Sequence, residues 1–141
     1  MNRGVTLVEV LMVVTLVGVL SALGVPRVFR VQDRIMVARA ASEVASFYHA
    51  ARYAAILRAR MVRIEFGAET LRAVYEGVTD STFLFRPGPR RHGVSLAASR
   101  AEVRVSPNGL GYGAANTTLV LRRGEAVDTL TTSRLGRLKR W

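Results

Sequence analysis

The sequence of 141 residues contains no cysteine, so disulfide bonds and thiolate chemistry are excluded. Histidine is scarce, since only His49 and His92 occur, and neither has a local neighbour at the spacing that holds zinc. The Gly-x-Ser-x-Gly motif of a nucleophilic serine is also missing from the sequence. The sequence therefore predicts a protein that is not an enzyme, with no cofactor, no metal ligand and no catalytic residue.

Acidic residues are few, with 10 Asp and Glu against 21 Lys and Arg, which gives a formal net charge of +11. The basic excess is spread over residues 26–60 and 61–141 and is not confined to one short segment. Such a charge favours anionic partners, namely lipid head groups, acidic protein surfaces or nucleic acid, although an Arg-rich solvated surface would have the same composition. Half of the residues are hydrophobic, which excludes a mostly disordered chain.

A long, predominantly apolar run occurs once, over residues 5–25, and Pro26 closes it. At about 1.5 Å per residue this run reaches roughly 31 Å as a helix, which matches the thickness of a bilayer core. A secretory signal has a shorter apolar region without an acid, whereas this run contains Glu9. A simple membrane anchor would leave Glu9 without a partner in lipid. Cleavage after Gly4 would create a suitable partner, because it frees the α-amino group of Val5.

This segment resembles the N-terminal signature of type IV pilins and of type II secretion pseudopilins. That signature is a short basic leader ending in Gly, then Phe, then Thr-Leu-Ile-Glu-Leu and an apolar helix. The positions that match here are Gly4, Thr6, Leu7, Glu9 and Pro26. Val5 departs from the pattern because the family usually has Phe there, and this departure bears on methylation more than on cleavage.

The resemblance implies that a prepilin peptidase cleaves between Gly4 and Val5 and methylates Val5. Glu9 would then attract the N-terminal cation of a neighbouring subunit during assembly, and Pro26 would kink the helix. The implied partners are other pseudopilins or pilins, the peptidase, an inner-membrane assembly platform and the lipid bilayer. The implied location is a single pass of the bacterial inner membrane with the C-terminal domain in the periplasm. Three arginines that follow the span favour the opposite orientation by the positive-inside rule, and here we follow the family.

Residues 27–60 contain neither Pro nor Gly and predict a continuation of the same helix. Its expected apolar stripe comprises Val31, Ile35, Ala38, Ala41, Ala45, Tyr48, Ala51, Ala55 and Ala59. From residue 61 the pattern alternates with a period of two, which is typical of half-buried strands. Strands are expected at 61–66, 71–75, 82–86, 94–96, 102–105, 118–122, 126–132 and 135–138, with a Gly-rich loop at 107–116.

The predicted fold is α+β and pilin-like, with a long N-terminal helix packed on antiparallel sheets. Its parts are a leader at 1–4, a transmembrane helix at 5–25, an amphipathic helix at 26–60 and a β-rich domain at 61–141. Within the β-rich part, a Pro-x-Gly at 107–109 and a later Gly136-Arg137 resemble the H-type pseudopilins and FimT minor pilins (the GspH/FimT group). That resemblance implies a minor pseudopilin at the tip of a type II secretion pseudopilus.

The alternative is a FimT-like type IV minor pilin that binds DNA for uptake. The candidate DNA-binding residues are Arg134, Arg137, Lys139 and Arg140. These cations would neutralise phosphates, and the neighbouring Trp141 would stack on a base. An exposed basic segment that binds no ligand would have the same composition. A third class of function is a basic membrane-anchored enzyme, but no catalytic site is visible in the sequence.

Overall fold

The computed structural model describes residues 6–77 and 79–141, and only the backbone of residues 23 and 26. The chain divides after Gln32 into two compact units. One helix, α1 (Leu7–Arg58), supplies most of the first unit and the first element of the second, and its backbone continues through position 26. The predicted long helix is therefore confirmed, while the kink at Pro26 stays a prediction.

Helix α1 ends without a glycine. Ala59 adopts a left-handed conformation with φ of 47°, the N–H of Ala59 donates to Ile56 O, and the N–H of Arg60 donates to Ala55 O. These two bonds form a Schellman motif, which normally uses glycine because a Cβ is unfavourable at this φ. The helix therefore stops where the strands begin, although the sequence has no glycine to mark the boundary.

Two antiparallel sheets follow the helix. The five-stranded sheet has the order β3-β2-β1-β5-β6, and the four-stranded sheet has the order β4-β7-β8-β9. The strands of the five-stranded sheet are β1 (Val62–Phe66), β2 (Thr70–Tyr75), β3 (Ser81–Pro87), β5 (Glu102–Val105) and β6 (Gly111–Tyr112). Those of the four-stranded sheet are β4 (Ser95–Ala98), β7 (Thr117–Arg123), β8 (Ala126–Thr132) and β9 (Leu138–Arg140). A short 3-10 helix, η1 (Pro89–His92), joins β3 to β4.

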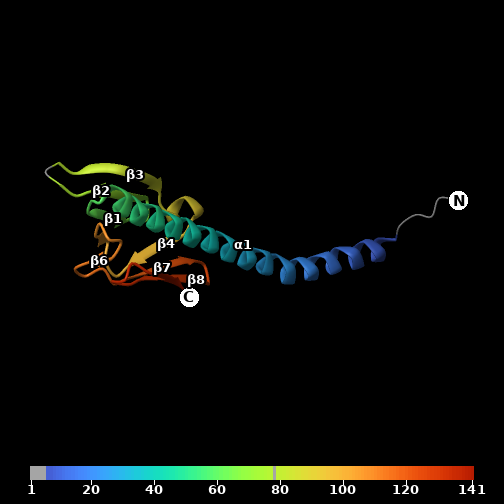
Figure 1. The fold of residues 1–141 in the computed structure, drawn as a ribbon. Helices are drawn as coiled ribbons and strands as arrows, with labels where there is room; N and C mark the ends of the chain where they lie inside the picture. The colour runs from blue at the N-terminus through green and yellow to red at the C-terminus, as the bar shows by residue number, and fades with distance from the viewer. Residues whose placement is uncertain (1–5, 78) are drawn as a thin grey trace. The chain divides into compact units, whose positions relative to one another are not determined.

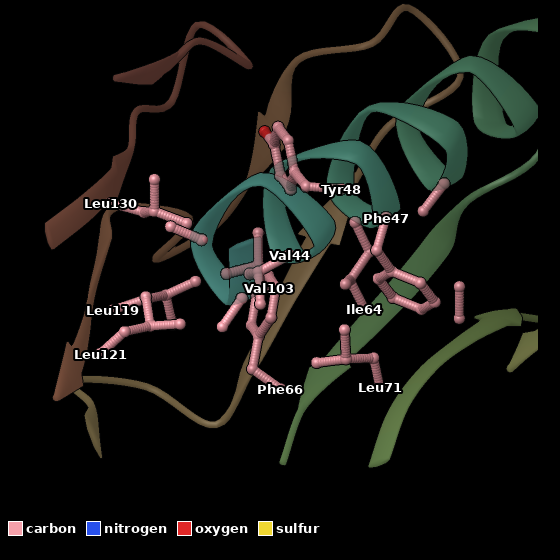
Figure 2. Close-up of a cluster of buried hydrophobic side chains, with 14 of the residues drawn as sticks. Val44, Phe47, Tyr48, Ile64, Phe66, Leu71, Val103, Leu119, Leu121 and Leu130 are labelled. Carbon is pink, nitrogen blue, oxygen red and sulfur yellow. The ribbon is translucent and has the colours of Figure 1, made fainter. Parts of the chain in front are cut away.

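The core of the second unit lies where the C-terminal half of α1 meets both sheets (Figure 1). Figure 2 shows Phe47 on the side of Ile64 and Leu71, and Leu119, Leu121 and Leu130 on the other side of the helix. Alternating burial along β1 and β7 places every second side chain in this core, as the period of two predicts. The predicted α+β architecture is therefore confirmed.

The predicted apolar stripe of the helix is partly wrong. Val31 and Ile35 are about half exposed, at 55% and 47%, and Ala59 is exposed as well. Ala41, Tyr48, Ala51 and Ala55 are buried as predicted. The buried face also includes four residues that the predicted stripe omits, namely Val37, Ala40, Val44 and Phe47. The reason is that two sheets pack on the helix, so the buried face is wider than one stripe. The larger side chains Val44 and Phe47 lie at the centre of this buried face.

Strand predictions fail at two short elements. The segment 107–116 is predicted to form only a loop, yet Gly111–Tyr112 pair with Arg104 and Val105 as β6. The last strand is predicted at 135–138 and lies at Leu138–Arg140, because Gly136 has a φ of 70° and closes a turn back to Ser133. Strands of two or three residues are too short for periodicity to reveal.

Candidate functional site: the start of the helix and the basic face

Gly4 and Val5, the predicted cleavage and methylation site, lie outside the described residues, and the description begins at Thr6. The hydroxyl of Thr6 accepts a hydrogen bond from the N–H of Glu9 at 3.3 Å, and its carbonyl accepts one from the N–H of Val10 at 3.2 Å. Thr6 is therefore the N-cap of α1, and Glu9 occupies the third helical position of a Thr-x-x-Glu capping sequence. A carboxylate in this first turn also interacts favourably with the positive end of the helix dipole.

The surface of α1 that follows Glu9 is apolar and exposed. Within the described residues, one 18-residue stretch of this helix has a mean hydropathy of 2.4 and no buried residue, so its length and composition are sufficient to cross a bilayer. Positions 18 and 24 are open, because a Cβ placed there would meet no atom within 4 Å. Gly24 lines a hollow of ≈ 540 Å³ together with Ser21 and five apolar residues between Val17 and Phe29. Such small-residue positions are where neighbouring helices can approach closely in a membrane.

The four cations predicted to bind DNA do not share one environment. Arg134 and Arg137 lie in the turn between β8 and β9, and both side chains are exposed. Arg140 on β9 instead donates from Nε to Asp128 Oδ2 at 2.7 Å and from Nη1 to Ser42 Oγ at 3.3 Å. Because Asp128 is buried, Arg140 serves to neutralise it and to fasten β9 to the helix.

Lys139 and Trp141 form a pair on the outer face of the four-stranded sheet. The ammonium of Lys139 lies 3.3 Å from the centroid of the Trp141 ring, which is a cation–π contact. The indole N–H of Trp141 donates to Thr131 Oγ1 at 3.1 Å, and its backbone N–H donates to Thr129 O at 2.9 Å. Trp141 is nevertheless 70% exposed, so part of its aromatic surface is held in place and open to solvent.

A charged junction that no sequence pattern reveals lies where the chain passes between the sheets. Glu43 on α1 contacts Arg91 Nη2 at 2.5 Å and His92 Nε2 at 3.0 Å, and both partners belong to η1. Burial raises the pKa of Glu43, but hydrogen bonds and charges from Arg91 and His92 outweigh it and lower the pKa below its usual value. Nearby, Arg123 Nε donates to Asp33 Oδ1 at 2.8 Å. The Glu43–His92 pair joins residues that are 49 positions apart in the sequence, and the Asp33–Arg123 pair joins residues that are 90 positions apart. No local sequence motif covers such separations.

No group of three or more His, Cys, Asp and Glu side chains that could hold a metal ion occurs among residues 6–77 and 79–141. The Gly-rich segment, which resembles a phosphate loop only superficially, lines a hollow of ≈ 430 Å³ with Arg100, Glu102 and Arg104. It connects β5 to β7 and contains β6, so it does not open a helix as a dinucleotide-binding loop must.

The architecture has relatives among solved structures. Two crystal structures of the type IV minor pilin FimU from Pseudomonas aeruginosa superpose with TM-scores of 0.64 and 0.62, at 17% and 15% sequence identity. The matches cover 75% and 73% of this chain and 88% and 90% of the FimU chains. The fold is that of the type IV pilins. No protein-family model matches the sequence, and the search of curated proteins finds no match.

The likeness to FimU concerns the pilin fold alone, because the sequence identity is low. It is consistent with the pilin-like signature at Thr6, Leu7 and Glu9, which the sequence shows by itself. A pilin fold and a pilin-like helix start therefore occur in the same chain, and they rest on different observations.

Proposed function

We propose that this chain is a minor subunit of a type IV pilin-like filament, anchored in the membrane by the first part of α1 until it is assembled. The observation that carries the proposal is the position of Glu9, in the first turn of a helix whose following surface is apolar and exposed. A carboxylate within the apolar part of a membrane needs a cation as its partner. The α-amino group of Val5, which cleavage frees in a neighbouring subunit, would supply that cation.

The energetic argument depends on the surroundings of this charge pair. Two opposite charges attract much more strongly in a medium of low dielectric constant than in water, although desolvation offsets much of that gain. The interaction becomes available only when another cleaved subunit lies alongside. Glu9 would therefore favour incorporation of subunits whose leader has been removed over subunits that still carry it.

The test compares Glu9→Gln with Glu9→Asp in the native host. Glu9→Gln keeps the size of the side chain but removes its charge, so we expect normal cleavage and loss of incorporation into the filament. Glu9→Asp retains a carboxylate and should restore part of the incorporation. Mass spectrometry of the mature protein checks the cleavage, and co-purification with the other filament subunits checks assembly. A mature protein that still begins at Met1, or normal co-purification of Glu9→Gln, would contradict the proposal.

For the filament system, the sequence pattern favours the tip of a type II secretion pseudopilus. This assignment rests on the H-type pattern in the β-rich part, including the Pro-x-Gly at 107–109 and Gly136-Arg137. It includes cleavage by a prepilin peptidase, contact with an inner-membrane assembly platform and a periplasmic position for the β-rich domain at 61–141. Deletion of the gene should then stop secretion of exported proteins, and re-expression of the intact chain should restore it.

A type IV minor pilin that binds DNA is the second candidate. Its support is that the exposed Arg134 and Arg137 are closely followed in the sequence by the Lys139–Trp141 contact, so one short segment combines cations with an accessible aromatic ring. Sequence-independent binding of single-stranded DNA uses this combination. In this case deletion of the gene would reduce DNA uptake and leave protein secretion unchanged.

A further inference from the structure

Exposed apolar side chains gather at the C-terminal end of α1, within the second unit. Leu57 is 81% exposed and Tyr53 is 61% exposed, and helical spacing places Tyr53 next to both Ile56 at i+3 and Leu57 at i+4. Two loops add Leu110, which is 41% exposed, and Leu135, which is 64% exposed. We define the set Tyr53, Ile56, Leu57, Leu110 and Leu135 as the distal patch.

Contacts of the Arg52 and Ile56 side chains with two glycines bring the three segments of the distal patch together. Arg52 on α1 donates from Nε to Gly109 O at 2.8 Å, and a Cβ at position 109 would lie 2.8 Å from Ile56 Cδ1. A Cβ at position 136 would fall on the carbonyl oxygen of Gly109 and 2.7 Å from Arg52 Nε. Leu110 and Leu135 are therefore the immediate neighbours of two glycines that touch each other beside the helix.

The loops that carry the distal patch are held in place by hydrogen bonds. Ser106 N–H donates to Leu110 O at 2.8 Å, and Gly111 N–H donates to Arg134 O at 2.8 Å. Arg134 N–H also donates to Asn116 Oδ1 at 2.9 Å. A preorganised apolar surface loses little conformational entropy when it binds, which distinguishes it from apolar side chains on a flexible loop.

The segments that contribute to the distal patch carry charge of one sign. The three contributing segments, residues 49–60, 106–116 and 133–141, contain no Asp and no Glu. Arg58, Arg134 and Arg137 are exposed on these same segments. A second copy of this chain bound patch to patch would place arginines against arginines, which is unfavourable. Charge complementarity instead requires a partner with an apolar centre bordered by carboxylates.

We propose that the distal patch is a docking surface for a different filament subunit, one that presents an apolar surface edged with Asp and Glu. This inference rests on the proposed filament function and deepens it, because it specifies the chemistry of the neighbouring subunit. The leucines would supply the buried centre of the contact, and the arginines would border it and exclude a second copy.

The first experiment uses the full-length chain in its native host with Leu57→Gln and Leu135→Gln combined. Both side chains are largely exposed, so the fold should be retained, as circular dichroism of the purified protein in detergent can verify. We expect about a tenfold reduction in co-purified filament subunits, because the central residues of an interface supply most of its binding free energy. The matched control combines Phe85→Gln and Val127→Gln, which change exposed apolar residues elsewhere and should leave co-purification unchanged. Normal co-purification of the Leu57 and Leu135 variant would overturn the proposal.

The second experiment places a photo-crosslinking amino acid at position 57 of the full-length chain. A crosslink to a different filament subunit, in an apolar segment next to Asp or Glu, supports the proposal. A crosslink to a second copy of the chain, to DNA, or to no partner overturns it. The two proposals fail in different ways. If the filament function is wrong, Glu9→Gln assembles normally. If only the docking surface is wrong, Glu9→Gln still fails to assemble, whereas the Leu57 and Leu135 variant co-purifies normally with the other subunits.

Discussion

The two sheets are alike on their inner faces and different on their outer faces. Both bury alternate apolar side chains against α1, as β1 and β7 show. The outer face of the five-stranded sheet carries an ionic network, in which Arg63 contacts Glu65, Glu76 and Asp80. The outer face of the four-stranded sheet carries hydroxyls and cations instead, with Thr118 opposite Thr131 and Thr131 opposite Lys139.

This difference between the outer faces shows which positive charges are paired within the protein. Hydrogen bonding and the charge of Asp80 raise the pKa of Arg63 despite partial burial, and Arg63 in turn lowers the pKa of Asp80. Arg63, Arg72 and Arg104 of the five-stranded sheet each lie within 4 Å of a carboxylate of the same sheet or its loops. Residues 106–141 contain six Lys and Arg against the two acids Glu125 and Asp128, whereas residues 61–105 contain seven Arg against five acids. Within the β-rich part, the larger basic excess therefore belongs to the segment that supplies β7, β8 and β9.

The largest expected effect comes from removing a core side chain on either side of the helix. Phe47→Ala should lower the free energy of unfolding by about 3–5 kcal/mol and Leu130→Ala by about 2–5 kcal/mol, because each leaves a cavity in a fully buried site. Chemical unfolding of the full chain in detergent, followed by circular dichroism, measures both. Phe85→Ala is the control, since that ring is 57% exposed and its removal should change stability by less than about 0.5 kcal/mol. Similar effects at Phe47 and Leu130 would show that the inner faces are equivalent.

A smaller effect is expected for DNA binding, which the second candidate function assigns to the side of the four-stranded sheet and not to that of the five-stranded sheet. For single-stranded DNA, the slope of log affinity against log salt concentration changes by about 0.7 for each phosphate contact. Replacing Arg134, Arg137 and Lys139 with Glu should therefore make this slope shallower by about 2. Arg72→Glu on the five-stranded sheet should leave this slope unchanged. Arg140 is omitted because its removal would leave Asp128 buried without its ion pair. A mobility-shift series over salt that shows no binding, or equal effects of the two changes, would reject this function.

The smallest effect concerns the junction between the sheets. Because the pKa of Glu43 is lower in the folded protein than its usual value of 4.5, its stabilisation is complete above about pH 4.5 and disappears as the pH falls through the folded value. Glu43→Gln should therefore reduce stability at neutral pH and remove part of the acid-induced destabilisation of the wild type. Unfolding midpoints at pH 7 and pH 3 measure this, and an equal deficit at both pH values would disprove the assignment.

Much of the fold can be predicted because the relevant patterns are local. The change from helical spacing to alternation near residue 61 marks the true end of α1, and the alternation in 62–66 predicts which side chains of β1 are buried. The sequence pattern predicts only part of the buried face of α1, including Ala41, Tyr48 and Ala51, because alanine is compatible with either side of a helix. The two sheets, and not the spacing of alanines, determine that Val37 and Val44 are buried while Val31 is exposed.

The candidate site is predictable only in its local part. Thr6 and Glu9 belong to one short motif, so their relation can be read directly from the sequence. The role of Arg140 cannot, because its partners Ser42 and Asp128 lie in other segments and meet it only through the packing of β9. For the same reason the helical pattern places Arg52 off the apolar stripe, whereas the structure has it partly buried against Gly109.

The close approach of Gly109 and Gly136 has a consequence for how this chain can evolve. Position 136 cannot accept a side chain while Gly109 and Arg52 stay in place, and a side chain at position 109 would meet Ile56 and Arg52 and require an unfavourable φ of 77°. Substitutions at 52, 109 and 136 would consequently be inherited as a set, and the two loops would lengthen or shorten only by moving away from the helix together. In a collection of descendants, these three positions should form a single block of correlated change.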